Sequence, residues 1–334
     1  MTPLHVFLLL LSAEFLCFSG ADSNKPVDTQ QPQLSRGINL PPTQGTTNAG
    51  AFLGGVYTYD YSLADFERMK KAGFGSLRIA INAETAEDPK SLEKIMSFFE
   101  QVDHNGVICF FDTKREGETT HGDGKPNDLE LLASCWEHIH EAFADKPNIS
   151  YELFNEPFGY QWTSKGATEY LSDMRKVIEL ASLPLDRCIV DGVGYSSNVQ
   201  LVAGAGWEGD LAYHFYPSWL PEGSKTQENY SNKVQHDLAG LSSRVHLTEF
   251  GADLCKGDVY ETYWSNGTVA SQDQNALRGL HDALEKLKQD GQRIASSYLW
   301  HGWDNGDSYD VWNPKATFGA EKVKQIQSNV GTQN

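Results

Sequence analysis

A chain of 334 residues with 40% hydrophobic and 22% charged side chains can form one large globular domain with a sizeable core, which argues against a disordered protein. Its 45 acidic residues outnumber the 27 basic ones, and the formal net charge of −18 repels nucleic-acid phosphates and anionic membrane surfaces. We therefore expect no nucleic-acid partner, whereas neutral polar substrates remain compatible with this charge.

Residues 1–21 have the pattern of a secretory signal peptide. Residues 6–11 are apolar and uncharged, and small residues follow them before Ala21, where we expect cleavage. A membrane anchor is the alternative, but Glu14 keeps the apolar run shorter than the roughly 18 to 20 residues that span a bilayer. We expect a secreted, extracellular protein without a membrane segment after cleavage, and a flexible leader over residues 22–34.

Secretion would expose the cysteines to an oxidising compartment, in which thiols can pair. The signal peptide removes Cys17, and the four cysteines that follow permit two disulfide bonds in three connectivities: Cys109, Cys135, Cys188 and Cys255. Three sequons predict glycan attachment in a eukaryotic host: Asn148, Asn229 and Asn266.

Short β-rich segments alternate with longer amphipathic segments between residues 35 and 330. Eight segments predict strands: 36–39, 76–80, 107–112, 149–155, 188–193, 210–216, 245–250 and 297–303. Five intervening segments carry apolar residues at three- and four-residue spacing and predict helices: 63–72, 90–105, 127–144, 168–181 and 272–289. Eight such units predict a parallel sheet closed into a (β/α)8 TIM barrel, with one catalytic domain over residues 35–330 and a tail at 331–334.

An open, doubly wound sheet is the alternative fold for this alternation. That fold would need a glycine-rich phosphate-binding loop directly after a strand. The only matching pattern, Gly204-Ala-Gly206-Trp-Glu-Gly209, precedes a predicted strand. We therefore interpret it as a turn, and the closed barrel is favoured.

Two predicted strands end with a glutamate and a residue that stops the strand. Glu156 precedes Pro157, and Glu249 lies two residues before Gly251. Reactive groups of a (β/α)8 barrel sit at the carboxyl ends of its strands, so both glutamates are catalytic candidates. Retaining hydrolysis of a glycosidic bond needs two carboxyl groups about 5–5.5 Å apart, one protonated and one ionised. Arg78, on the second predicted strand, is placed to keep one of them ionised.

From about Arg36 to near the C-terminus the sequence resembles glycoside hydrolase family 5, the large group of cellulases and related endo-β-glycanases. The resemblance rests on Asn155-Glu156-Pro157 and on Thr248-Glu249-Phe250-Gly251. It implies that Glu156 is the acid/base and Glu249 the nucleophile of a double displacement. We expect no cofactor and no metal ion in this reaction.

The same resemblance implies substrate contacts for residues near other strand ends. Asn155 would bind the sugar 2-hydroxyl beside the bond that is cleaved, and Tyr216, with His214 in the same motif, would orient the nucleophile. Trp300 would stack on the sugar at the cleavage point, and Trp303 would extend this platform. With Arg78, these residues complete the expected substrate-binding set.

One position departs from the family pattern, which usually has Asp, a spacer and His at the end of the third strand. Here Asp112 and Thr113 are followed by Lys114, whose longer, charged side chain would alter that subsite. By the resemblance we expect a monomeric endo-β-glycosidase acting on polysaccharide or oligosaccharide, with β-1,4-glucan as substrate. A β-mannanase, another β-glycanase, an enzyme for glycolipid headgroups and a carbohydrate-binding barrel without hydrolysis are the alternatives.

Other sequence features favour structural roles. His138 and His140 lie two residues apart on a predicted helix and point to different sides, which does not favour a metal site. Residues 304–310 are acidic but lack the twelve-residue calcium loop with its final Glu, so we interpret them as the loop after the eighth strand. Trp136 is expected in the core. Three other tryptophans are candidates for sugar stacking: Trp162, Trp207 and Trp219.

Overall fold

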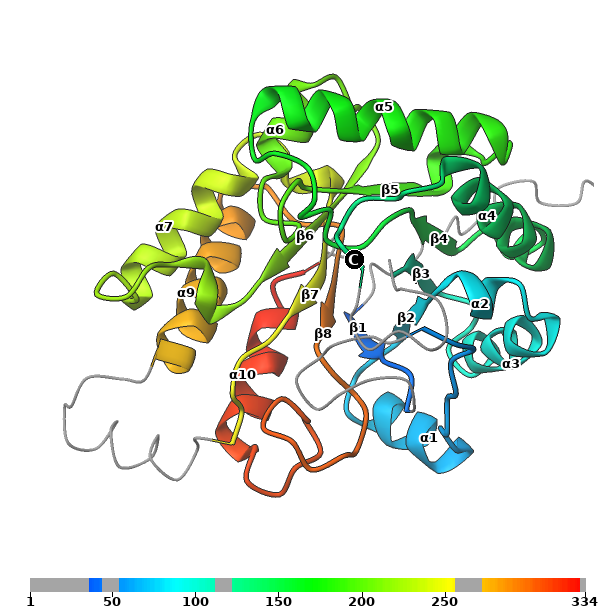
Figure 1. Cartoon of the computed structure of the whole chain (residues 1–334). Helices are drawn as coiled ribbons and strands as arrows, with labels where there is room; N and C mark the ends of the chain where they lie inside the picture. Colours follow the sequence, from blue (N-terminus) through cyan, green and yellow to red (C-terminus); the bar gives the residue numbers. More distant parts are fainter. Residues whose placement is uncertain (1–35, 44–53, 112–121, 256–271, 331–334) are drawn as a thin grey trace, which may run out of the picture. The chain divides into compact units, whose positions relative to one another are not determined.

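The computed structural model describes residues 36–43, 54–111, 122–255 and 272–330 (Figure 1). The chain divides into two units, Met1–Gln31 and Pro32–Asn334, and every described residue belongs to the second. Several predictions fall outside the described residues: the signal peptide, the leader, the tail, Asp112, Thr113, Lys114 and Asn266.

Eight parallel strands close into a barrel in sequence order, and the last pairs with the first. Their bounds are β1 (Arg36–Leu40), β2 (Ser76–Ile81), β3 (Gly106–Phe110), β4 (Ile149–Glu152), β5 (Cys188–Asp191), β6 (Asp210–Phe215), β7 (Val245–Phe250) and β8 (Ser296–Leu299). The predicted (β/α)8 barrel is confirmed, and each predicted strand overlaps an observed one. Most strand residues are buried because helices cover one face of the sheet and the barrel interior covers the other.

Helices surround the strands (Figure 1). They are α1 (Leu63–Lys71), α2 (Ala83–Ala86), α3 (Pro89–Glu100), α4 (Leu129–Phe143), α5 (Ser164–Leu180), α6 (Val199–Gly204), α7 (Gln227–Leu238), α9 (Gln272–Gln289) and α10 (Thr317–Gln327). The five predicted helices correspond to α1, α3, α4, α5 and α9. None of the helices in the described part of the chain is long and apolar enough to span a bilayer.

Side-chain caps fix where several helices begin. Ser62 and Asp65 form a reciprocal capping box at the start of α1. Asp88 accepts a hydrogen bond from Ser91 N at the start of α3, where Pro89 occupies the first turn. Asp128 caps α4 in the same way. These caps satisfy backbone donors that the first helical turn leaves without a partner.

The barrel interior contains an apolar layer below a layer of charged side chains. Val107, Ile189, Ala212 and Tyr298 form the apolar layer. The Tyr298 ring lies so close to Gly37 that a Cβ there would come within 2.0 Å of Tyr298 Cδ1, which explains the need for glycine. The charged layer includes Arg78 and Glu152, both fully buried, and it supports the site at the carboxyl ends of the strands.

The prediction of disulfide bonds is wrong for the described residues, where no two cysteines are joined. Cys109 lies on β3 and contacts Arg78 inside the barrel, and Cys135 is buried on α4. The Cys188 thiol lies 3.4 Å from Pro184 O, and the Cys255 thiol lies 3.7 Å from Asp307 O. The four cysteines therefore belong to different parts of the barrel wall.

Candidate active site

Glu156 and Glu249 both lie at the carboxyl end of the barrel. Glu249 is part of β7, whereas Glu156 comes four residues after the last residue of β4. The chain keeps strand-like hydrogen bonds beyond β4, because Leu153 N donates to Ile189 O (3.1 Å) and Asn155 N donates to Phe110 O (2.8 Å). The backbone that carries Glu156 is therefore held by both neighbouring strands.

The carboxyl groups of the two glutamates lie close together, and His214 contacts both of them. One carboxylate oxygen of Glu156, one of Glu249 and a ring nitrogen of His214 all lie within 4.8 Å of one another. His214 Nδ1 is 2.8 Å from Glu156 Oε1 and 3.6 Å from Glu249 Oε2. The Glu156 side chain is 22% exposed and the Glu249 side chain 6%. The more accessible carboxyl group is thus the one after β4.

Both carboxylate oxygens of Glu249 accept short hydrogen bonds. Arg78 Nη1 donates to Oε1 (2.6 Å), and the Tyr216 hydroxyl donates to Oε2 (2.6 Å). Burial, followed by the negative charge of Glu249, raises the pKa of Tyr216 well above its ordinary value, so the phenol keeps the proton that it donates. One cationic and one neutral donor therefore hold the two oxygens of Glu249 in place.

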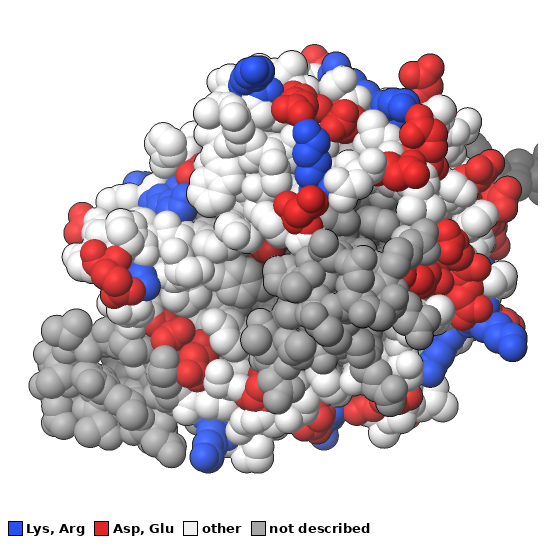
Figure 2. All heavy atoms as spheres, viewed as in Figure 1, with Lys and Arg blue, Asp and Glu red and all other residues white. Residues whose placement is uncertain are grey.

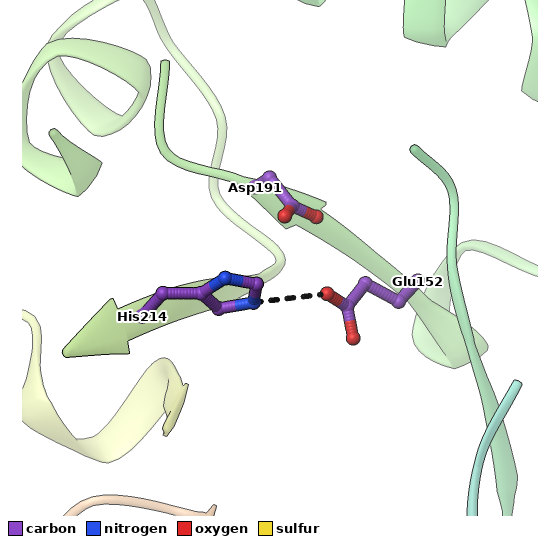
Figure 3. A group of neighbouring side chains, drawn as sticks. All are labelled: Glu152, Asp191 and His214. Carbon is purple, nitrogen blue, oxygen red and sulfur yellow. Dashed lines mark ion pairs between the residues drawn. The ribbon is translucent and has the colours of Figure 1, made fainter. Parts of the chain in front are cut away.

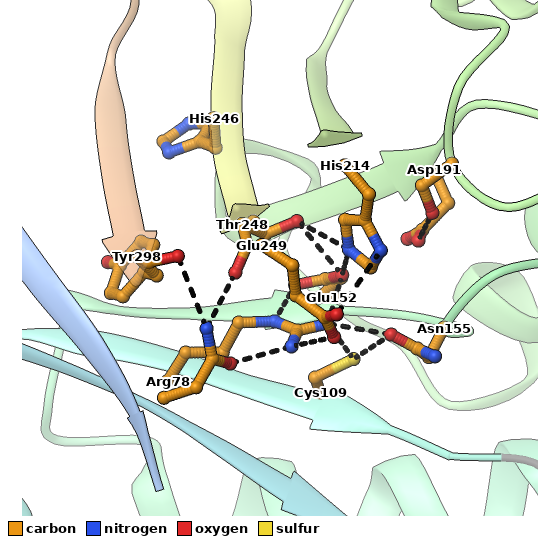
Figure 4. Close-up of polar contacts among 12 residues, drawn as sticks. Arg78, Cys109, Glu152, Asn155, Asp191, His214, His246, Thr248, Glu249 and Tyr298 are labelled. Carbon is orange, nitrogen blue, oxygen red and sulfur yellow. Dashed lines mark hydrogen bonds and ion pairs between the residues drawn. The ribbon is translucent and has the colours of Figure 1, made fainter. Parts of the chain in front are cut away.

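Arg78 connects the nucleophile candidate to a second buried carboxylate (Figure 4). Its Nε and Nη2 donate to the two oxygens of Glu152, each at 2.7 Å. Burial raises the pKa of Glu152, but the charge of Arg78 and hydrogen bonds from His214 and Arg78 outweigh it and hold the pKa below its ordinary value. Arg78 Nη2 also donates to Asn155 Oδ1 (2.7 Å).

Arg78→Met is expected to lower the free energy of unfolding by about 3–5 kcal/mol, because it leaves two buried carboxylates without their cation. Urea denaturation at pH 7 measures this loss. The double variant with Glu152→Gln should recover part of it, since one of the uncompensated charges is then removed. A loss below about 1 kcal/mol for the single variant would contradict this account of the ion pairs.

His214 supplies a second cation between the carboxylates. Burial lowers its pKa, but the charge of Glu249 and hydrogen bonds with Glu152 and Glu156 outweigh burial and raise the pKa to about 10. Its Nε2 lies 3.1 Å from Thr248 Oγ1 and 3.6 Å from Glu152 Oε1. The imidazolium can therefore donate toward Glu156 on one side and toward the buried layer on the other.

Among the described residues, two groups of side chains have the spacing of metal ligands. They are Glu152, Asp191 and His214, and Glu156, His214 and Glu249. In both groups a protonated His214 offers no lone pair to a metal ion, and Arg78 already binds one carboxylate of each group. The protein's own cations thus take the place that a metal ion would fill.

Trp300 and Trp303 follow β8, and both are half-buried. Trp300 N donates to Phe250 O (2.8 Å), which holds this residue next to the end of β7. A Cβ on Gly251 would lie 3.1 Å from Trp300 O and 3.1 Å from Tyr216 Cε1. Glycine therefore allows the loop to pass closely between these groups.

Aromatic rings extend from Tyr216 toward solvent. The Trp219 ring centroid lies 5.7 Å from that of Tyr216, and Trp219 Nε1 donates to His214 O (2.6 Å). Tyr195 lies between Trp219 and Trp162, with centroid distances of 6.1 and 5.8 Å. Trp162 is 53% exposed. Trp162 and Trp219, two of the predicted stacking candidates, thus belong to one group of rings that reaches the site.

Two other tryptophans are structural. Trp207 is buried, and its indole N–H donates to Asp210 O (2.7 Å), so its prediction as a sugar-stacking residue is wrong. The ring covers the start of β6 instead. Trp136 lies in the core as predicted, with its N–H donating to Leu153 O.

The remaining polar motifs also make structural contacts. His140 Nδ1 lies 3.1 Å from the Tyr151 hydroxyl, and His138 is exposed on α4. In the acidic loop after β8, Asp307 accepts hydrogen bonds from Tyr309 N and Asp310 N. The Asp307 carboxylate therefore accepts hydrogen bonds from the backbone of its own loop.

Sequence reasoning missed two buried acids of the site, Glu152 and Asp191. Asp191 ends the apolar strand β5, so the strand-end criterion that selected the two glutamates could have found it. Glu152 is the last residue of β4 but lies inside the longer predicted strand 149–155, where its charge among apolar residues was the available signal. Most of their partners are far away in the sequence, because barrel closure brings Arg78 and His214 next to Glu152 and the backbone of Glu156 next to Asp191.

Comparison with known proteins places this site in a family. The family model for cellulase, glycosyl hydrolase family 5, matches residues 41–307. An endoglucanase from Pseudomonas stutzeri, solved with cellobiose, has a similar fold with a TM-score of 0.60 and 13% identity, over 89% of this chain and 94% of that one. An endo-β-1,4-glucanase from Xanthomonas axonopodis pv. citri has a TM-score of 0.59 and 14% identity, over 88% of this chain and 99% of that one.

An endocellulase from Pyrococcus horikoshii, solved with cellotetraose, also has this fold, with a TM-score of 0.59 and 13% identity, over 87% of this chain and 92% of that one. A search of curated protein sequences finds no match. At these identities the solved structures establish the common fold, and the family model covers most of the sequence. The chain therefore belongs to the cellulase family, glycosyl hydrolase family 5, and is a glycoside hydrolase.

Proposed function

We propose that the protein is a secreted, retaining endo-β-glucanase that cleaves β-1,4-glucan by double displacement. The observation that carries this proposal is the pair of Glu156 and Glu249, whose nearest carboxylate oxygens lie within 4.8 Å. Retaining glycosidases place their carboxyl groups about 5–5.5 Å apart, whereas inverting enzymes need about 6.5–9.5 Å to admit a water molecule. The short separation supports direct attack by one carboxylate.

In the first step Glu249 attacks the anomeric carbon while Glu156 protonates the oxygen of the leaving sugar. The bond between the anomeric carbon and that oxygen breaks, and an ester between the sugar and Glu249 forms. In the second step Glu156, now ionised, takes a proton from water as the water oxygen attacks the anomeric carbon. This step releases Glu249 and returns the proton to Glu156.

The polar contacts fit this division of roles. Arg78 and Tyr216 donate to the two carboxylate oxygens of Glu249, which orients the nucleophile. His214 contacts Glu156 Oε1, so the second oxygen of Glu156 can carry the proton for the leaving group. Once that proton is transferred, the new carboxylate lies next to an imidazolium that stabilises it.

We assign sugar binding to two further residues. Arg78 can only donate, so the oxygen of the Asn155 amide faces it and the NH2 group points away. That NH2 group is the donor that we assign to the sugar 2-hydroxyl. Trp300 O lies beside Gly251 in the loop after Glu249, and we assign the Trp300 indole to stacking on the sugar at the cleavage point.

A neutral glucan is the substrate that the fold and the surface of the protein support best. Solved structures of the same fold are endoglucanases and endocellulases, and two of them hold cellobiose or cellotetraose. Figure 2 shows acidic and basic side chains interspersed on one face, with no continuous basic patch among its described residues. Exposed rings such as Trp162 can stack on sugars, which also supports a carbohydrate ligand.

The substrate is tested by incubating the purified protein with carboxymethylcellulose, β-mannan and β-1,3-glucan and measuring new reducing ends. We expect release from carboxymethylcellulose and little from the other two polymers. Protein carrying Glu249→Gln, purified in parallel, controls for contaminating enzymes. Activity on mannan or β-1,3-glucan alone would assign a different substrate to the same barrel. Binding without cleavage of any polymer would support the non-hydrolytic alternative.

A further inference from the structure

Two residues with a left-handed backbone conformation donate hydrogen bonds to the same buried carboxylate oxygen, Oδ1 of Asp191. Glu156 has φ 45° and Ser196 has φ 53°, although neither is glycine. Glu156 N donates to Asp191 Oδ1 (3.1 Å), and the Ser196 hydroxyl donates to the same oxygen. Asp191 is fully buried at the end of β5. A single side chain therefore links the loop after β4 to the loop after β5.

The backbone of Glu156 needs such support. A left-handed conformation costs a residue other than glycine about 1–3 kcal/mol and persists only where the surroundings enforce it. The next residue is Pro157, which normally favours an extended backbone in the residue before it. Local preferences thus oppose the observed backbone of Glu156, and the hydrogen bond to Asp191 is a contact from outside the segment that holds it.

We propose that Asp191 is a positioning residue for Glu156. Asp191 accepts a hydrogen bond from the backbone N–H of Glu156 and thereby orients the Glu156 carboxyl group toward the leaving-group oxygen. This inference rests on the proposed acid/base role of Glu156 and adds the element that orients it. Asp191 itself reaches the substrate in no step. It is fully buried and acts through the backbone N–H of Glu156.

The second oxygen of Asp191 shows which property of this side chain matters. Oδ2 is buried without a hydrogen-bond partner among the described residues, and the carboxyl group faces Glu152 and His214 (Figure 3). Burial, followed by the charge of Glu152, raises the pKa of Asp191 well above its ordinary value. This shift disfavours the charged carboxylate, so we assign the positioning role to the oxygen that accepts from Glu156 N rather than to a negative charge.

Asp191→Asn and Asp191→Ala separate these properties. Asparagine keeps an oxygen that can accept from Glu156 N, whereas alanine removes it. The substrates are aryl β-glycosides of the disaccharide that the polymer assay identifies, with either phenol or 2,4-dinitrophenol as leaving group. Phenolate is a poor leaving group, so its departure needs protonation by an acid. Dinitrophenolate is a good leaving group and departs without protonation. kcat/KM reports the step in which the leaving group departs.

For Asp191→Ala we expect kcat/KM to fall about 10²-fold with the phenyl glycoside and less than about fivefold with the dinitrophenyl glycoside. Asp191→Asn should stay within about threefold of wild type on both, because it keeps the acceptor. Asp191→Ser, whose hydroxyl is too short to reach Glu156 N, should show the same selectivity as Asp191→Ala. It provides the test if Asp191→Ala does not fold.

Val190→Ala is the matched control. Val190 precedes Asp191 on β5, and its side chain packs into the core on the opposite face of the strand. It should lower stability without preferring either leaving group. An equal loss on both glycosides for Asp191→Ala, or as large a loss for Asp191→Asn, would overturn the inference. Glu156→Ala is measured beside them. If Glu156→Ala itself lacks the selectivity, the proposed acid/base role fails; if only the Asp191 variants lack it, the positioning role alone fails.

Discussion

Replacing Glu249 with glutamine is expected to abolish turnover and leave the fold intact. Glutamine has the same shape and still offers an oxygen to Arg78, which also keeps its two hydrogen bonds to Glu152. An amide is a far weaker nucleophile than a carboxylate, so the covalent intermediate cannot form at a useful rate. We expect kcat to fall by about 10⁴-fold or more, equivalent to at least about 5 kcal/mol of lost transition-state stabilisation.

The loss is measured with the polymer that the wild-type protein hydrolyses, together with circular dichroism and urea denaturation to verify the fold. Glu130→Gln is a matched control, since this glutamate is exposed on α4 and pairs with Lys176. It should retain wild-type activity. If Glu249→Gln kept more than about 1% of the wild-type rate, Glu249 would not be the nucleophile.

Glu156→Ala is expected to slow hydrolysis according to the leaving group. Without the acid, kcat/KM for a phenyl glycoside should fall about 10²- to 10⁴-fold, whereas a dinitrophenyl glycoside should react nearly as before. The glycosyl-enzyme then accumulates because water lacks its general base. Azide, which needs no base, should restore kcat on the dinitrophenyl substrate and yield a β-glycosyl azide.

Steady-state kinetics with and without azide, and chromatography of the product, measure these effects. Glu156→Gln provides the control for the space that alanine opens, since it removes the acid but blocks the approach of azide. A uniform loss on both leaving groups, with no response to azide, would exclude Glu156 as the acid/base.

Much of the fold could be predicted from the sequence because each strand is a short apolar segment between longer amphipathic ones. The helices that were not predicted have weaker patterns. In α7 the buried positions Tyr230, Val234 and Leu238 recur every four residues within an otherwise polar segment. α2 and α6 have four and six residues, which is too short for an apolar period to be recognised.

The candidate site could be predicted only where its residues stand in local motifs. Glu156 and Glu249 follow from strand ends with proline or glycine nearby. Glu152 and Asp191 could not be assigned partners, because their contacts to Arg78, His214 and the backbone of Glu156 form only when β2, β4, β5 and β6 close around one interior. The same reason explains the cysteines, since an even number of thiols says nothing about which sides of the barrel they face.

The stereochemistry of hydrolysis tests the central claim most directly. Proton NMR during the first minutes of cleavage of a β-1,4-gluco-oligosaccharide reports the anomer of each new reducing end before mutarotation mixes the two. Because oxygens of Glu156 and Glu249 come within 4.8 Å, we predict that the β-anomer appears first and the α-anomer only later. An initial α-anomer would mean inversion and would contradict the double displacement through Glu249.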